Sequence, residues 1–138
     1  MDSLRNLALL MARIAMAGVF VYDATLMARF PGDNVAFMEQ HGIPGLMLWP
    51  TATLQFVGGL LLVIGLATRL SALAFAGFCA LTALAFHLDF SQVTESVQFG
   101  KDAALAGGFL ALAAAGAGAW SLDQALSTDF WPLRSAAG

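Results

Sequence analysis

Four segments of about 20 mostly apolar residues dominate the sequence, and short polar breaks separate them. A helix rises about 1.5 Å per residue, so about 20 residues cross the roughly 30 Å hydrocarbon core of a bilayer. In lipid the backbone must be satisfied within a helix or a closed barrel, and these segments lack the alternation of barrel strands. We therefore predict an all-α integral membrane four-helix bundle with spans at residues 4–27, 46–67, 70–88 and 103–119.

The balance of apolar and charged residues supports this prediction. Hydrophobic residues make up 59% of the 138 residues and charged residues only 11%, whereas soluble domains average about 45–50% and about 25%. A lipid bilayer is therefore the expected partner of most of the surface. The net charge of −3 is spread without a basic stripe, so nucleic acid is not expected as a partner.

The polar breaks predict one membrane domain over residues 1–138. Residues 35–41, capped by Asp33 or Asn34, are expected to form a short interfacial helix between spans one and two. A tight turn at Thr68-Arg69 is expected to join spans two and three, and residues 89–100 are expected to form a polar loop. Asp102 then falls at the start of span four, where a carboxylate suits the positive end of a helix. Residues 120–138 are predicted to be a cytoplasmic tail.

Positive charges bias the orientation, because cytoplasmic loops are enriched in Lys and Arg. With the N-terminus inside, Arg5, Arg69 and Arg134 are cytoplasmic and Arg13 lies near that side, while Arg29 and Lys101 face outward. The four-to-two bias predicts that both termini are cytoplasmic.

Polar side chains at membrane depth are the candidate cofactor-binding residues, because such groups are costly in lipid. They are Arg13, Tyr22, Asp23, Gln55 and His87. Arg13 either snorkels to the cytoplasmic surface or points into the bundle. Asp23 is either a helix-end residue or a proton or ligand contact, and interhelical hydrogen bonding is the default role of Gln55. His87 is either a hydrogen-bonded structural residue or a proton acceptor beside a quinone headgroup.

Other chemistry has little support in the sequence. His41, His87 and Asp89 are possible metal ligands, but they lack the close spacing of a metal motif, and no metal site is predicted. Cys79 stands alone, so an intrachain disulfide and a paired-cysteine redox motif are excluded. No nucleotide loop, Ser-His-Asp pattern or paired-carboxylate motif is present. We therefore assign no catalytic residue.

Several motifs along the chain resemble the DoxX family of small bacterial membrane proteins. The resemblance extends from Arg13 to Asp123, and its most distinctive part is the closing Gly116-Ala117-Gly118-Ala119-Trp120-Ser121-Leu122-Asp123. The other matching motifs are Arg13-Ile14, Gly18-Val19-Phe20, Met38 to Gly45, Gln55-Phe56-Val57-Gly58-Gly59-Leu60, Gly65 to Arg69, Phe86 to Phe90, Lys101-Asp102 and Gly107-Gly108.

This resemblance implies a four-helix bundle in the bacterial inner membrane and an association with redox enzymes. It points to an accessory subunit of a quinone-linked system without independent catalysis, binding a quinone or a lipid and accompanied by other membrane subunits or further copies. A purely structural subunit and a small oligomeric transporter are the alternatives. Family members commonly carry a Lys and a Glu where this chain has Met27 and Gln55. Replacing both partners of a buried ion pair together is physically coherent, but it weakens any chemistry that needs the pair.

Overall fold

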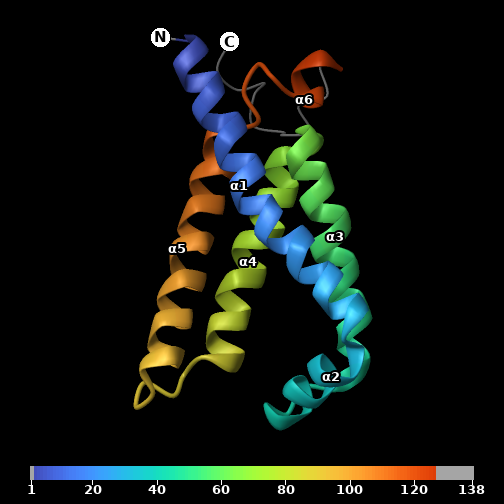
Figure 1. The fold of residues 1–138 in the computed structure, drawn as a ribbon. Coiled ribbons are helices and arrows are strands. Elements are labelled where there is room, and N and C mark those ends of the chain that lie inside the picture. The colour runs from blue at the N-terminus through green and yellow to red at the C-terminus, as the bar shows by residue number, and fades with distance from the viewer. Residues whose placement is uncertain (1, 127–138) are drawn as a thin grey trace.

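The protein is mainly helical over residues 2–126, the part that the computed structural model describes, and that part contains no strand (Figure 1). The all-α prediction is therefore confirmed. The elements, in chain order, are α1 (Asp2–Arg29), α2 (Pro31–Gln40), the 3-10 helix η1 (Gly45–Met47), α3 (Leu48–Ile64), α4 (Thr68–Phe86), α5 (Val93–Ala115) and α6 (Leu122–Ala125).

The four long helices pack as two pairs, α1 with α3 and α4 with α5 (Figure 1). The start of α1, the α3–α4 turn and α6 lie at one end of the molecule, which we call the terminal end. Helix α2 and the α4–α5 loop lie at the other end, which we call the loop end.

Three of these helices are long and apolar enough to cross a membrane: α1, the combined η1–α3 helix from Gly45 to Ile64, and α4. Helix α5 has 23 residues, but Glu95, Lys101 and Asp102 lie in its first half. Its composition therefore falls short of a membrane span, and the predicted count of four spans stays a prediction.

Three local predictions are corrected by the structure. The turn expected at Thr68-Arg69 lies at residues 65–67, where Gly65 and Ala67 adopt positive φ, and Thr68 already begins α4. Helix α5 begins at Val93, so most of the expected polar loop at residues 89–100 is helical. The polar side chains of residues 93–100 are compatible with a helix, because they can point away from the helix axis while the backbone keeps its hydrogen bonds. Helix α2 begins at Pro31, because proline suits the first helical position, and neither Asp33 nor Asn34 caps it: its N-cap is Phe30, which makes no capping hydrogen bond.

Aromatic packing between the two helix pairs forms the centre of the core. Phe20 of α1 lies 4.6 Å from Phe75 of α4 and 5.6 Å from Phe109 of α5, measured between ring centroids. The Phe75 and Phe109 rings stack at 5.2 Å. Aromatic pairs at these separations contribute about 0.5–1.5 kcal/mol beyond their buried area. Many large apolar side chains remain exposed on the outer faces of the helices, as expected of a protein surrounded by lipid.

Candidate functional site

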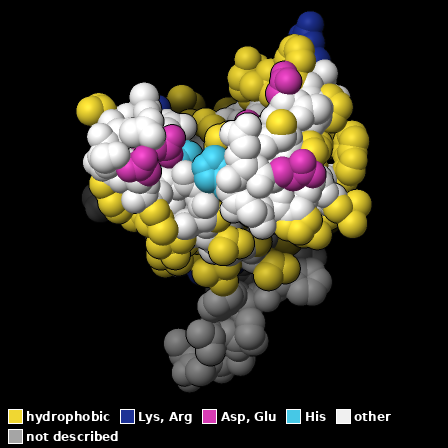
Figure 2. Space-filling view, turned by 90° about the horizontal axis from the view of Figure 1, so that it is seen from below, with side chains coloured by type: hydrophobic (Ala, Val, Ile, Leu, Met, Phe, Trp, Pro, Cys, Tyr) yellow, Lys and Arg dark blue, Asp and Glu magenta, His cyan; other side chains and the backbone are white. Residues whose placement is uncertain are grey.

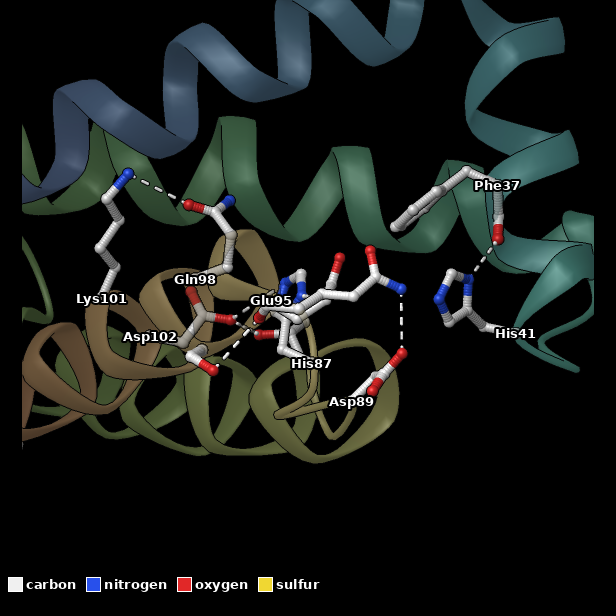
Figure 3. A network of polar contacts seen from close by, with 11 residues as sticks. Phe37, His41, His87, Asp89, Glu95, Gln98, Lys101 and Asp102 are labelled. Atoms are coloured by element: carbon white, nitrogen blue, oxygen red, sulfur yellow. Dashed lines mark hydrogen bonds and ion pairs between the residues drawn. The ribbon is translucent and has the colours of Figure 1, made fainter.

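A polar network lies between α4 and α5 near the loop end, and it centres on His87 (Figure 3). Nδ1 of His87 lies 2.7 Å from Oε2 of Glu95, and its Nε2 lies 4.0 Å from Oδ2 of Asp102. Thr82 donates a hydrogen bond to the same Asp102 oxygen over 3.0 Å. We call these four residues the His87 network. The contact with Glu95 fixes the orientation of the His87 imidazole. The other ring nitrogen, Nε2, then faces the Asp102 carboxylate.

The network continues toward the other helix pair through Asp23 and Gln55. Asp102 acts electrostatically on Asp23 of α1, and the side chain of Gln55 on α3 acts on Asp23 as a hydrogen-bonding neighbour. Gln55 is buried, and its Oε1 accepts no hydrogen bond within the described residues. A buried acceptor without a donor costs about 1–3 kcal/mol, so a ligand that donates to this oxygen gains binding energy here.

Both histidines reach the loop end of the molecule. Figure 2 shows them in cyan near the centre of this face, with acidic side chains on either side. His41 is exposed and its Nδ1 lies 2.9 Å from the carbonyl of Phe37, while its ring contacts Phe37 and Phe86. Within residues 2–126 no three His, Cys, Asp or Glu side chains are close enough to hold a metal ion.

Asp89 lies within the α4–α5 loop and is tied to the residues that follow it. Its carboxylate accepts hydrogen bonds from the hydroxyl and N–H of Ser91 and from the amide of Gln92. These bonds favour the ionised form and hold the pKa of Asp89 below its usual value. The loop hydrogen bonds are therefore present at neutral pH and are lost only in acid, as the pH falls through this lowered pKa.

Arg13 lies away from this network, at the terminal end. Its guanidinium is fully buried and donates from Nη2 to the carbonyl of Trp120. Nearby, the Asp123 carboxylate accepts the backbone N–H groups of Ala67 and Thr68 over 2.7 and 2.9 Å. Asp123 also donates its own N–H to the carbonyl of Gly65 and acts electrostatically on Arg13. We call this set the Asp123 cluster: Arg13, Gly65, Ala67, Thr68, Trp120 and Asp123.

The five predicted binding residues therefore do not form a single site. Asp23 and Gln55 are neighbours, and Asp102 links them to His87. Arg13 points into the bundle rather than to the surface, in the Asp123 cluster. The Tyr22 side chain is 65% exposed and faces outward.

Three important residues were missed by reasoning from the sequence. Glu95 was placed in a loop and Asp102 at a helix start, yet the helix that carries them brings both to His87. Asp123 was placed in a tail, but residues 120–126 fold against the bundle and Asp123 is buried. The one signal for it was its place in the closing DoxX-like motif.

Comparison with known proteins agrees with this architecture. The DoxX family profile matches residues 8–88, more than half of the chain. The chain is 39% identical over 127 residues to inner membrane protein YqjF of Escherichia coli K12, covering 92% of this chain and 98% of that protein. It is 33% identical over 128 residues to inner membrane protein YphA of the same organism, covering 87% and 91%. No solved structure matches significantly. On the length of the profile match and the coverage of these relatives, the chain belongs to the DoxX family.

Proposed function

We propose that this protein is an accessory subunit of a quinone-linked redox system in the bacterial inner membrane. In this proposal Asp23, Gln55 and His87 contact the headgroup of a quinone or quinol, while electron transfer belongs to a partner oxidoreductase. Arg13 and Tyr22 are left out of the headgroup site because they lie apart from the other three.

The observation that carries the proposal is the buried Gln55 Oε1, which has no hydrogen-bond donor among residues 2–126 and lies beside ionisable groups that lead to His87. A quinol hydroxyl is a donor that this oxygen lacks. When a quinol is oxidised it releases two protons with its two electrons. The Asp23 and Asp102 carboxylates and the His87 imidazole are groups that can accept such protons.

Removing the polar group of Gln55 is expected to weaken ligand binding without a comparable loss of folding stability. Gln55→Leu should weaken binding of a short-chain quinol, ubiquinol-1, by about fivefold, because the hydrogen bond of about 1 kcal/mol from a quinol hydroxyl to Gln55 Oε1 is lost. The same change should alter the stability of the folded protein only slightly, since it removes the buried unpaired oxygen but also the hydrogen-bonding neighbour of Asp23. Calorimetric titration in nanodiscs measures the first effect, and detergent-induced unfolding measures the second.

His87→Ala and His41→Ala form a matched pair for this test, since both histidines lie at the loop end. Ubiquinol-1 binding should weaken for His87→Ala and stay within twofold of wild type for His41→Ala. Absence of saturable binding to the wild-type protein, or equal losses for the two variants, would overturn the quinone site.

A purely structural subunit is the second candidate, since exposed apolar helix faces can pack against another membrane protein as well as against lipid. Purification in a mild detergent distinguishes the candidates when combined with the quinone titration. An oxidoreductase recovered in equal amounts together with quinone binding supports the accessory redox role. A stoichiometric partner without quinone binding supports the structural role.

A further inference from the structure

The hydrogen-bonding groups that stay free in the proposed headgroup site are acceptors. The clearest is Oε1 of Gln55, whose side chain is 2% exposed and which accepts no hydrogen bond from residues 2–126. The carboxylates of Asp23 and Asp102 are acceptors as well when they are ionised. A ligand with hydroxyl groups can donate to these oxygens, whereas a ligand with carbonyl groups alone cannot.

Asp23 sets the orientation of the Gln55 amide. The Gln55 side chain is a hydrogen-bonding neighbour of the Asp23 carboxylate, and only the NH₂ half of an amide can donate to a carboxylate. Nε2 of Gln55 is therefore engaged by Asp23, and Oε1 is left for a ligand. Asp23 is in this sense a positioning residue for the buried acceptor.

Glu95 has the same effect on the imidazole of His87. A neutral imidazole donates through one ring nitrogen and accepts through the other. Nδ1 of His87 lies 2.7 Å from Oε2 of Glu95, and a carboxylate at this distance favours the proton on Nδ1. In the neutral ring Nε2 then keeps its lone pair and is a further acceptor.

The donors around the site are already engaged. The hydroxyl of Thr82 lies 3.0 Å from the carbonyl of Cys79 and 3.0 Å from Oδ2 of Asp102, and it donates to both. Lys101 donates to Gln98 over 3.1 Å (Figure 3). Backbone N–H groups inside a helix donate to carbonyls of the same helix. These groups therefore offer no free donor to a quinone carbonyl.

We propose that the site distinguishes the two redox forms of its ligand and binds the quinol more tightly than the quinone. Oε1 of Gln55 is the specificity-determining group, and Asp23 positions it. A quinol hydroxyl donates to this oxygen, whereas a quinone carbonyl places a second acceptor against it and leaves both unpaired. The inference rests on the proposed function, because it needs a quinone site at these residues.

Titration of the wild-type protein in nanodiscs with ubiquinol-1 and with ubiquinone-1 tests the selectivity. The titrations are anaerobic and at about pH 8, which favours the neutral imidazole. Ubiquinol-1 should bind about tenfold more tightly, because it pairs an acceptor that ubiquinone-1 leaves unpaired. Tighter binding of the reduced form raises the midpoint potential of the bound couple, by about 30 mV for a tenfold preference. A redox titration in the presence of the protein measures this shift independently.

Gln55→Leu should reduce the preference for ubiquinol-1 to about twofold, because it removes the acceptor and weakens quinol binding about fivefold. Asp23→Asn tests the positioning role. An Asn amide can accept from Gln55 or donate to it, so the Gln55 amide can turn its NH₂ group toward the ligand. Ubiquinone-1 should then bind more tightly than it binds to the wild type, a gain that a merely structural defect would not produce.

Asp33→Asn is the matched control, since Asp33 is an exposed aspartate of α2 at the loop end. It should keep the wild-type preference. Equal affinity of the wild type for the two forms, or tighter binding of ubiquinone-1, would overturn the selectivity and leave the quinone site in place. Binding of neither form would remove the quinone site and the selectivity with it.

The variants separate the roles of the two residues. An unchanged preference in Gln55→Leu would overturn the role of the Gln55 oxygen. A parallel loss of both affinities in Asp23→Asn, or the same change in Asp33→Asn, would overturn the positioning role of Asp23.

Discussion

Gly65→Ala is expected to destabilise the folded bundle by roughly 2–5 kcal/mol. Gly65 ends α3 with a φ of 72°, in the left-handed region that costs an L-residue roughly 1–2 kcal/mol. A Cβ atom there would also overlap the buried guanidinium of Arg13 and crowd Ser121. Overpacking of this kind adds roughly 1–3 kcal/mol. The midpoint of unfolding in mixed detergent and SDS micelles, followed by tryptophan fluorescence, measures the loss.

Gly77→Ala is the control for this prediction. Gly77 lies in the middle of α4 on an exposed face, and a Cβ atom there meets nothing within 4 Å. Alanine should therefore leave stability unchanged or raise it by about 0.5–1 kcal/mol through helix propensity. If Gly65→Ala unfolds at the same SDS fraction as Gly77→Ala, the close approach of Arg13 to the α3–α4 turn does not matter for stability.

Asp123→Ala is expected to have an effect of similar or larger size, roughly 3–5 kcal/mol. It removes the acceptor of two backbone N–H groups, those of Ala67 and Thr68. It also leaves the buried Arg13 without its acidic neighbour. The loss of the Ala67 bond is serious for a second reason: Ala67 has a φ of 50°, a strained conformation for a residue with a side chain, which persists only when its surroundings hold it.

The control for Asp123→Ala is Gln124→Ala in the same short helix, because Gln124 is exposed. Its unfolding midpoint should stay close to that of the wild type, within the roughly 0.5 kcal/mol typical of surface changes. Asp123→Asn should give an intermediate value, since it keeps one acceptor oxygen and loses the charge. Similar midpoints for Asp123→Ala and Gln124→Ala would show that the Asp123 cluster contributes little to the folded state.

The lengths of the apolar runs predicted three helices well. The span expected at 4–27 corresponds to α1 (Asp2–Arg29), and the spans at 46–67 and 70–88 correspond to η1–α3 and α4 with shifts of at most three residues. Helix α5 was predicted less well, because Glu95 and Lys101 interrupt the apolar pattern although the backbone continues as a helix. Hydropathy indicates whether a segment is surrounded by lipid or by water. The first residue of a helix is set instead by its backbone hydrogen bonds.

The candidate site was predictable only in part. Asp23, Gln55 and His87 stand out in the sequence because polar groups are rare in apolar segments. Their arrangement depends on which faces of different helices meet, and a single sequence does not contain that information. Asp123 is an example. Its carboxylate accepts hydrogen bonds from Ala67 and Thr68, which precede it in the chain by 56 and 55 residues.

The long sequence separation within the Asp123 cluster has a consequence for biosynthesis. Arg13 lies in α1, which precedes the other described helices in the chain, but its carbonyl acceptor is Trp120, 107 residues later. At about 5–20 residues per second, roughly 5–20 s pass between the synthesis of the two. During that time the guanidinium must be solvated by water, headgroups or other parts of the nascent chain. The terminal end of the bundle is therefore completed last, when translation of the described chain is almost finished.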